Sequence, residues 1–95
     1  MKENRKIVRT HSAGVFFGEI VSREGKEATI KNARRIWYWA GAASLSELAQ
    51  RGTSLPQKCK FPVPVDFITV TEVIEILDVT PAAARSIDSV PPWTA

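Results

Sequence analysis

The segment from Phe67 to Leu77 limits the possible folds more than any other part of this sequence. It is rich in β-branched residues, which favour strands because their side chains pack well on a pleated surface, and it is long enough for one bent strand or two. Residues 58–65 precede it and carry Pro62 and Pro64 at alternate positions, which removes two backbone donors and indicates an extended connection or a sheet edge. We therefore expect a chain built around a sheet.

The first half of the chain supplies the other strands. Residues 7–10 and 15–21 have the content of strands, and residues 27–30 complete a hairpin after a turn at 23–26, where Gly25 accepts a positive φ at little cost. A small-residue turn is expected at 11–14. A second turn is expected at 31–33, followed by a third antiparallel strand at 34–39, where residues alternate between two faces.

Two short helices are predicted from their capping residues. Ser44 and Glu47 match a capping box, in which each side chain bonds a backbone N–H at the helix start, and Gly52 can close this helix. Thr80 as N-cap and Pro81 at the first helical position begin a second helix that runs to about residue 89. The prediction is an α+β fold with a small antiparallel sheet of four to six strands and two short helices.

The length of 95 residues is enough for one core and too short for two, so a single domain over residues 1–95 is expected, with residues 1–5 flexible and 90–95 an extended tail. The lone Cys59 cannot form an internal disulfide, which favours a reducing compartment. No apolar run follows the basic N-terminus as a signal peptide would require, and no segment reaches the length of a membrane span. These observations lead us to expect a cytoplasmic protein.

Charge is distributed unevenly along the chain. Residues 1–35 hold nine Lys or Arg against four Glu, whereas residues 36–95 hold four against six acidic residues. Such asymmetry is compatible with a basic face for phosphates or an acidic partner, and equally with an ordinary solvated surface.

Residues for catalysis or metal binding are sparse. The single histidine, His11, lies far in sequence from Cys59, so no metal-ligand cluster is indicated, and a buried, inert cysteine with a surface histidine is the simpler interpretation. In a strand, Glu72 and Glu75 would face opposite sides and could not cooperate as acid and base. No glycine-rich phosphate loop is present. We expect no enzymatic activity, no catalytic residues, no metal and no cofactor.

The residues best suited to bind a ligand lie between Arg34 and Trp39. Arginines supply paired donors for phosphate or carboxylate, and aromatic rings offer planes on which a base can stack. The candidate ligand-binding residues here are Arg34, Arg35, Trp37 and Trp39. The alternative is that the tryptophans fill the core of a small domain, with the arginine stems packed beside them.

A second polar group precedes the small-residue turn. Arg9 and Ser12 are candidate donors that could converge on the same ligand if the first strand pairs beside the third.

The chain resembles a family of small proteins encoded by bacteriophages. Five segments carry the resemblance: residues 9–15, 25–27, 32–39, 44–49 and 71–76. The resemblance implies a phage accessory protein that acts in the bacterial cytoplasm. Small phage proteins of this kind often counter host defences, some as oligomeric sponges that sequester nucleotide immune signals, and this is an analogy of context.

The leading functional hypothesis is a non-enzymatic, homo-oligomeric protein that captures a small phosphorylated nucleotide. The apolar tail around Trp93 could dock on a neighbouring subunit, and the alternative is that it docks on its own chain or is disordered. One alternative is an inhibitor of a host defence or replication enzyme that acts through a protein interface, with Arg and Trp residues as hot spots. Another is a nucleic-acid binder that uses the basic N-terminal third.

Overall fold

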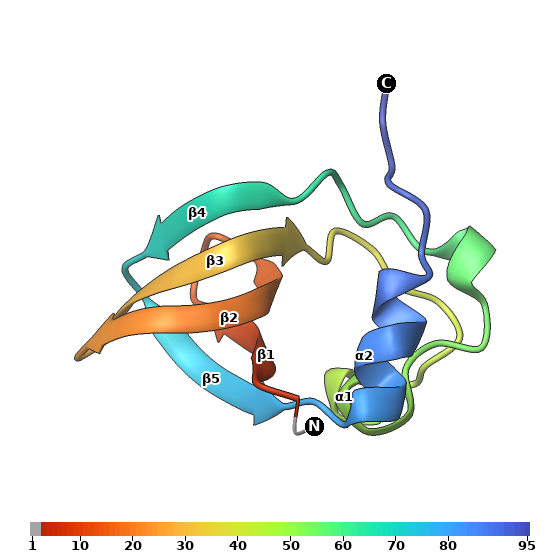
Figure 1. Cartoon of the computed structure of the whole chain (residues 1–95), viewed down its shortest axis with the longest axis horizontal. Helices are drawn as coiled ribbons and strands as arrows, with labels where there is room; N and C mark the ends of the chain where they lie inside the picture. Colours follow the sequence, from red (N-terminus) through yellow and green to blue (C-terminus); the bar gives the residue numbers. More distant parts are fainter. Residues whose placement is uncertain (1–2) are drawn as a thin grey trace.

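The computed structural model describes residues 3–95 as a five-stranded antiparallel sheet with two helices (Figure 1), which confirms the α+β prediction. The elements are β1 (Arg5–Thr10), β2 (Val15–Glu24), β3 (Glu27–Arg35), α1 (Leu45–Arg51), a 3₁₀ turn η1 (Pro56–Lys58), β4 (Val65–Val70), β5 (Val73–Asp78) and α2 (Pro81–Asp88). In space the strand order is β4-β3-β2-β1-β5. Of the segment expected to be flexible, residues 1–2 lie outside the described part, and Arg5 already belongs to β1.

The sheet curls around one of its two hydrophobic clusters. All five strands contribute to this cluster, whose buried members are Val8, Phe16, Ala28, Ile30, Ala33, Val70 and Val73. The two edge strands, β4 and β5, are joined only by residues 71–72 and converge at one end of the sheet (Figure 1). A flat sheet would separate its edges, so a cluster shared by both edge strands shows that the sheet closes partly on itself.

The second cluster lies between the sheet and the helices. Because side chains alternate along a strand, Ile7 and Phe17 point away from their neighbours Val8 and Phe16 and join the apolar faces of α1 and α2. Among the helix residues buried there are Leu48, Ala49, Ala83, Ala84 and Ile87. The helices therefore cover one face of the sheet, and none within residues 3–95 has the length and apolar character to cross a membrane.

The prediction of a turn at residues 31–33 is wrong, and so is the prediction of a separate strand at 34–39. β3 continues through Asn32, which takes a φ of 51°. Asn tolerates this left-handed conformation better than most residues. Asn32 therefore produces a local kink within the strand and not a turn that reverses the chain. After Arg35 the chain leaves the sheet until β4, and of residues 36–39 only Tyr38 forms a β-bridge, with Lys60.

Both helix starts are confirmed. The Ser44 hydroxyl accepts from the Glu47 N–H at 3.2 Å, and the Thr80 hydroxyl accepts from the Ala83 N–H at 3.0 Å. The capping box differs in one detail, because the Glu47 carboxylate accepts from the N–H of Ala43 instead of that of Ser44. The strand-rich segment 67–77 divides into β4 and β5.

Candidate functional site

The two adjacent arginines at the end of β3 point to opposite faces of the sheet. Arg34 lies opposite Phe17, whose side chain faces the helices, and Arg35 lies opposite Phe16, whose side chain belongs to the cluster inside the curl. Arg34 is buried and Arg35 is exposed. Their chemical roles are therefore different although their positions differ by one.

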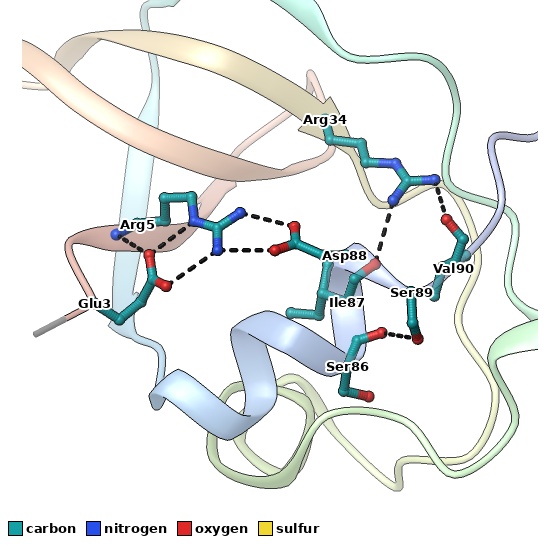
Figure 2. Close-up of polar contacts among 8 residues, drawn as sticks. All are labelled: Glu3, Arg5, Arg34, Ser86, Ile87, Asp88, Ser89 and Val90. Carbon is teal, nitrogen blue, oxygen red and sulfur yellow. Dashed lines mark hydrogen bonds and ion pairs between the residues drawn. The ribbon is translucent and has the colours of Figure 1, made fainter. Parts of the chain in front are cut away.

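Arg34 holds the end of α2 and the segments next to it. Its guanidinium donates to four backbone carbonyls: to Ile87 at 3.2 Å, Val90 at 2.7 Å, Phe61 at 3.2 Å and Pro62 at 3.2 Å. Figure 2 shows the bonds to Ile87 and Val90 at the C-terminal end of α2, where a cation is also favoured by the helix dipole. Burial lowers the pKa of Arg34, and the nearby charge of Asp88 opposes this effect. With its donors committed to the backbone, Arg34 is a structural residue.

Arg35, Trp37 and Trp39 lie close together, although the chain leaves the sheet after Arg35. They line a surface groove of about 280 Å³ with Ile36 and residues 13–15. The Arg35 guanidinium lies 4.8 Å from the centre of the Phe16 ring and forms no ion pair within residues 3–95. Trp39 is half-buried against the helix-side cluster, while Trp37 is 63% exposed. The groove thus combines an exposed cation with two indole rings.

The turn after β1 is fixed by its own hydrogen bonds. The Thr10 hydroxyl donates to the Gly14 carbonyl at 2.8 Å and accepts from the Ala13 N–H at 3.0 Å. Gly14 has a φ of 99° and supplies no side chain, so the wall of the groove at this point is backbone. The groove is therefore bounded on this side by a rigid turn.

A surface that the sequence did not predict adjoins the groove. The ring centroids of Trp37 and Trp93 are 6.2 Å apart with an interplanar angle of 17°, and the Lys60 ammonium lies 5.5 Å from the Trp93 ring centre. We call Trp37, Lys60 and Trp93 the aromatic surface. Its three residues come from three segments of the chain. Two pairings hold these segments together: Lys60 forms a β-bridge with Tyr38, and the Trp93 N–H donates to the Phe61 carbonyl at 2.9 Å. The C-terminal tail thus docks on its own chain.

Arg9 and Ser12 are not part of this groove. The geometry on which their role depended is wrong, because β2 lies between β1 and β3. Arg9 pairs with Glu75 at 3.1 Å, and the Ser12 hydroxyl donates to Glu72 at 2.7 Å. Both side chains are engaged with carboxylates of β5 or of the turn before it.

The basic N-terminal strand is largely neutralised by the acidic C-terminal half. Besides Arg9, Lys6 pairs with Asp78 at 2.6 Å. Arg5 bonds both Glu3 and Asp88, at 2.7 Å each (Figure 2), and its guanidinium lies 4.8 Å from the Phe17 ring centre. Hydrogen bonding to Arg5 lowers the pKa of Glu3, and hydrogen bonding to Glu3 and then to Asp88 raises the pKa of Arg5. The charge asymmetry of the sequence therefore does not become a basic face on β1.

A larger groove, of about 400 Å³, is a poorer candidate site. Its cations are Arg5 and Arg34, which the Glu3 and Asp88 carboxylates and the backbone carbonyls already occupy. An incoming anion would have to displace bonds that stabilise the fold.

Cys59 and His11 have no shared site. Cys59 is buried, and its Sγ contacts the backbone of Ala40 and Leu55 and the hydroxyl of Thr53. His11 is exposed beside Lys26 and Glu72. Over residues 3–95, His, Cys, Asp and Glu form no group of three that could hold a metal ion.

The structure is a small β-rich domain with a curled sheet, a face covered by two helices and a groove lined by aromatic residues. The chain belongs to a family described as a domain of unknown function, DUF6948, whose model matches residues 3–87. The match includes the whole sheet and nearly all of α2 and ends before Trp93. Comparisons with curated proteins and with solved structures gave no significant match.

Proposed function

We propose that this protein is a non-enzymatic binding protein that captures a small phosphorylated nucleotide in the groove formed by Arg35, Trp37 and Trp39. The observation that carries the proposal is the convergence of an exposed guanidinium and two indoles on one groove of about 280 Å³. The guanidinium donates to phosphate oxygens in paired geometry, and an indole face stacks on a base. The other three residues suggested by the sequence, Arg9, Ser12 and Arg34, have no part in this site because each is bonded elsewhere.

The biological setting is part of the same proposal. The resemblance to small phage-encoded proteins supports a phage accessory protein in the bacterial cytoplasm, and capture of a nucleotide immune signal would make it a counter-defence sponge. A sponge acts by stoichiometry, so a homo-oligomer with one groove per subunit suits the role.

The test is native mass spectrometry of the purified protein, with and without extract from bacteria whose nucleotide-signalling defences have been triggered. The expected result is a defined oligomer that gains the mass of one nucleotide per subunit. Arg35→Ala should abolish the gain, and isothermal titration with mono-, di- and cyclic nucleotides should identify the ligand class. A full panel that binds wild type and Arg35→Ala equally would overturn the proposal.

The matched control is Arg23→Ala, at an exposed arginine near the hairpin turn whose side chain donates to the Gly25 carbonyl. This change also removes one positive charge and leaves the groove intact. Loss of binding in Arg35→Ala but not in Arg23→Ala would separate a specific phosphate contact from an effect of net charge.

A second candidate is an inhibitor of a host defence or replication enzyme. It is favoured by the exposure of Trp37 at 63% and Trp93 at 45%, because Trp and Arg are the residues most enriched in interface hot spots. If the mass stays unchanged with every nucleotide while a host enzyme assay is inhibited, this candidate replaces the first.

A further inference from the structure

The aromatic surface is continuous with the proposed groove. Trp37 lines the groove and at the same time stacks on Trp93, so the groove and the indole pair share one side chain. A ligand that leaves the groove past Trp37 therefore meets Trp93 and Lys60 next.

The electrostatics of this region favour a polyanion. The groove is lined by residues 13–15, 35–37 and 39, and Lys60 and Trp93 lie beside it. Arg35 and Lys60 are the cations of this region, and no Asp or Glu is among the residues that line the groove. Elsewhere, the cations of β1 are matched with carboxylates, but Lys60 and Arg35 have no such partner among residues 3–95. The uncompensated positive charge thus lies beside the exposed indoles.

We propose that the groove and the aromatic surface together bind a single strand of nucleic acid, with one nucleotide in the groove and the next on the aromatic surface. This inference rests on the proposed function and names its substrate class. Proteins that bind single strands combine a positively charged track for the backbone with aromatic rings on which successive bases stack. Trp39 and Trp37 offer rings at the groove, Trp93 offers the next ring, and Arg35 and Lys60 flank them.

The position of Trp93 is built into the fold. Its backbone N–H is bonded to Phe61, Pro92 pairs with Phe61, and Val90 is anchored by Arg34. Ordering of the tail before binding lowers the entropy that a ligand would otherwise have to overcome.

The experiment measures fluorescence anisotropy of a labelled oligothymidylate of about eight nucleotides, a length within the usual site size of one small domain. Thymidine monophosphate and inorganic phosphate are the competitors. The oligonucleotide should bind at least roughly 10-fold more tightly than the mononucleotide, since each stacked base adds to the affinity. Trp93→Ala should weaken oligonucleotide binding roughly 5- to 100-fold and leave mononucleotide binding unchanged.

The contribution of positive charge to binding is tested by the salt dependence of the affinity. For single strands the slope of log affinity against log salt concentration is about −0.7 per phosphate contact, so Lys60→Gln should make the slope shallower by about 0.7. The matched controls are Phe67→Ala and Lys31→Gln, an exposed aromatic and an exposed lysine that lie opposite each other on β4 and β3. Neither control should change binding.

Each contrary result has one meaning. If thymidine monophosphate binds as tightly as the oligonucleotide and Trp93→Ala has no effect, the oligonucleotide proposal is overturned and the mononucleotide groove stands. If nucleotides bind neither as monomers nor as oligomers, both proposals fail. If a polyglutamate peptide competes as well as the oligonucleotide, binding depends on charge alone and base stacking is excluded.

Discussion

At the scale of single residues, Arg34 and Arg35 give the sharpest contrast in the molecule. Arg34→Ala removes a buried cation that bonds four carbonyls, and we expect a loss of about 2–4 kcal/mol in the free energy of unfolding. Arg35→Ala removes an exposed guanidinium that lies over the Phe16 ring, and we expect a loss of about 1 kcal/mol or less. Urea denaturation of both variants measures the difference.

A further variant separates the charge of Arg34 from its geometry. Arg34→Lys keeps the charge but cannot reach four carbonyls with one ammonium, so it should recover only part of the loss. If Arg34→Ala and Arg35→Ala were equally stable, the structural role of Arg34 would be refuted.

Glu3 gives a prediction for pH. Its pKa is lowered from 4.5 chiefly by the hydrogen bond from Arg5, so the pair stabilises the fold above that pH and loses its effect as the pH falls through the lowered pKa. Glu3→Gln should therefore lower the melting temperature at pH 7 and match wild type at pH values well below the pKa. Because both side chains are partly exposed, the effect at pH 7 should stay near about 1 kcal/mol or less. A difference between the two proteins that does not change with pH would contradict this origin.

The sequence alone could not show that Arg34, Arg9 and Ser12 bond other parts of the protein and do not line the groove. The partners of Arg34 lie at Phe61, Pro62, Ile87 and Val90, and those of Arg9 and Ser12 lie on or beside β5, so each pairing is set by how distant segments meet. Arg35, Trp37 and Trp39 do line one groove, but strand alternation is not the reason, because β3 ends at Arg35 and Ile36 lines the same groove.

At the scale of elements, the sequence predicted local structure correctly where a residue type at a given position favours a single conformation. Ser44 and Thr80 cap helices as predicted, since a hydroxyl before a helix bonds a free N–H of the first turn. Asn32 has two meanings, a turn or a kink inside a strand, and only its pairing with neighbouring strands decides between them. β3 pairs with β2 and β4 on both sides of Asn32, which keeps the strand continuous.

The kink in β3 can be tested directly. Asn32 has a φ of 51°, a conformation that glycine adopts freely and that β-branched residues avoid. Asn32→Gly should leave the unfolding free energy nearly unchanged, whereas Asn32→Val should lower it by about 1–2 kcal/mol. Chemical denaturation compares the two, with Lys31→Val as a control for the same new side chain one position earlier. Equal stability of the glycine and valine variants would show that this conformation is not required.

At the scale of the whole molecule, the chain brings its two ends into the same structure. β1 lies between β2 and β5, so the basic N-terminal strand meets the acidic residues that follow Val70. The sequence indicated the surplus of charge but not its neutralisation, because the strand order depends on long-range pairing. Arg35 and Lys60, near the C-terminal tail, form no ion pair among residues 3–95. For the tail itself the sequence alone left docking on a neighbour, self-docking and disorder open, and the structure shows it docked on its own chain.

The domain should stay folded when the last four residues of the tail are removed. A chain that ends at Pro91 retains Val90 and its bond from Arg34, and it loses the pairing of Pro92 with Phe61 and the Trp93 ring. We expect a cost of about 1–2 kcal/mol, the sum of one backbone hydrogen bond and a half-exposed indole, so the truncated protein should stay folded. Far-ultraviolet circular dichroism should be unchanged, and the tryptophan emission should shift because Trp37 loses its stacking partner. A truncated protein that is unfolded would mean that the tail belongs to the core, whereas a folded one with unchanged Trp37 emission would mean that the two indoles do not stack in solution.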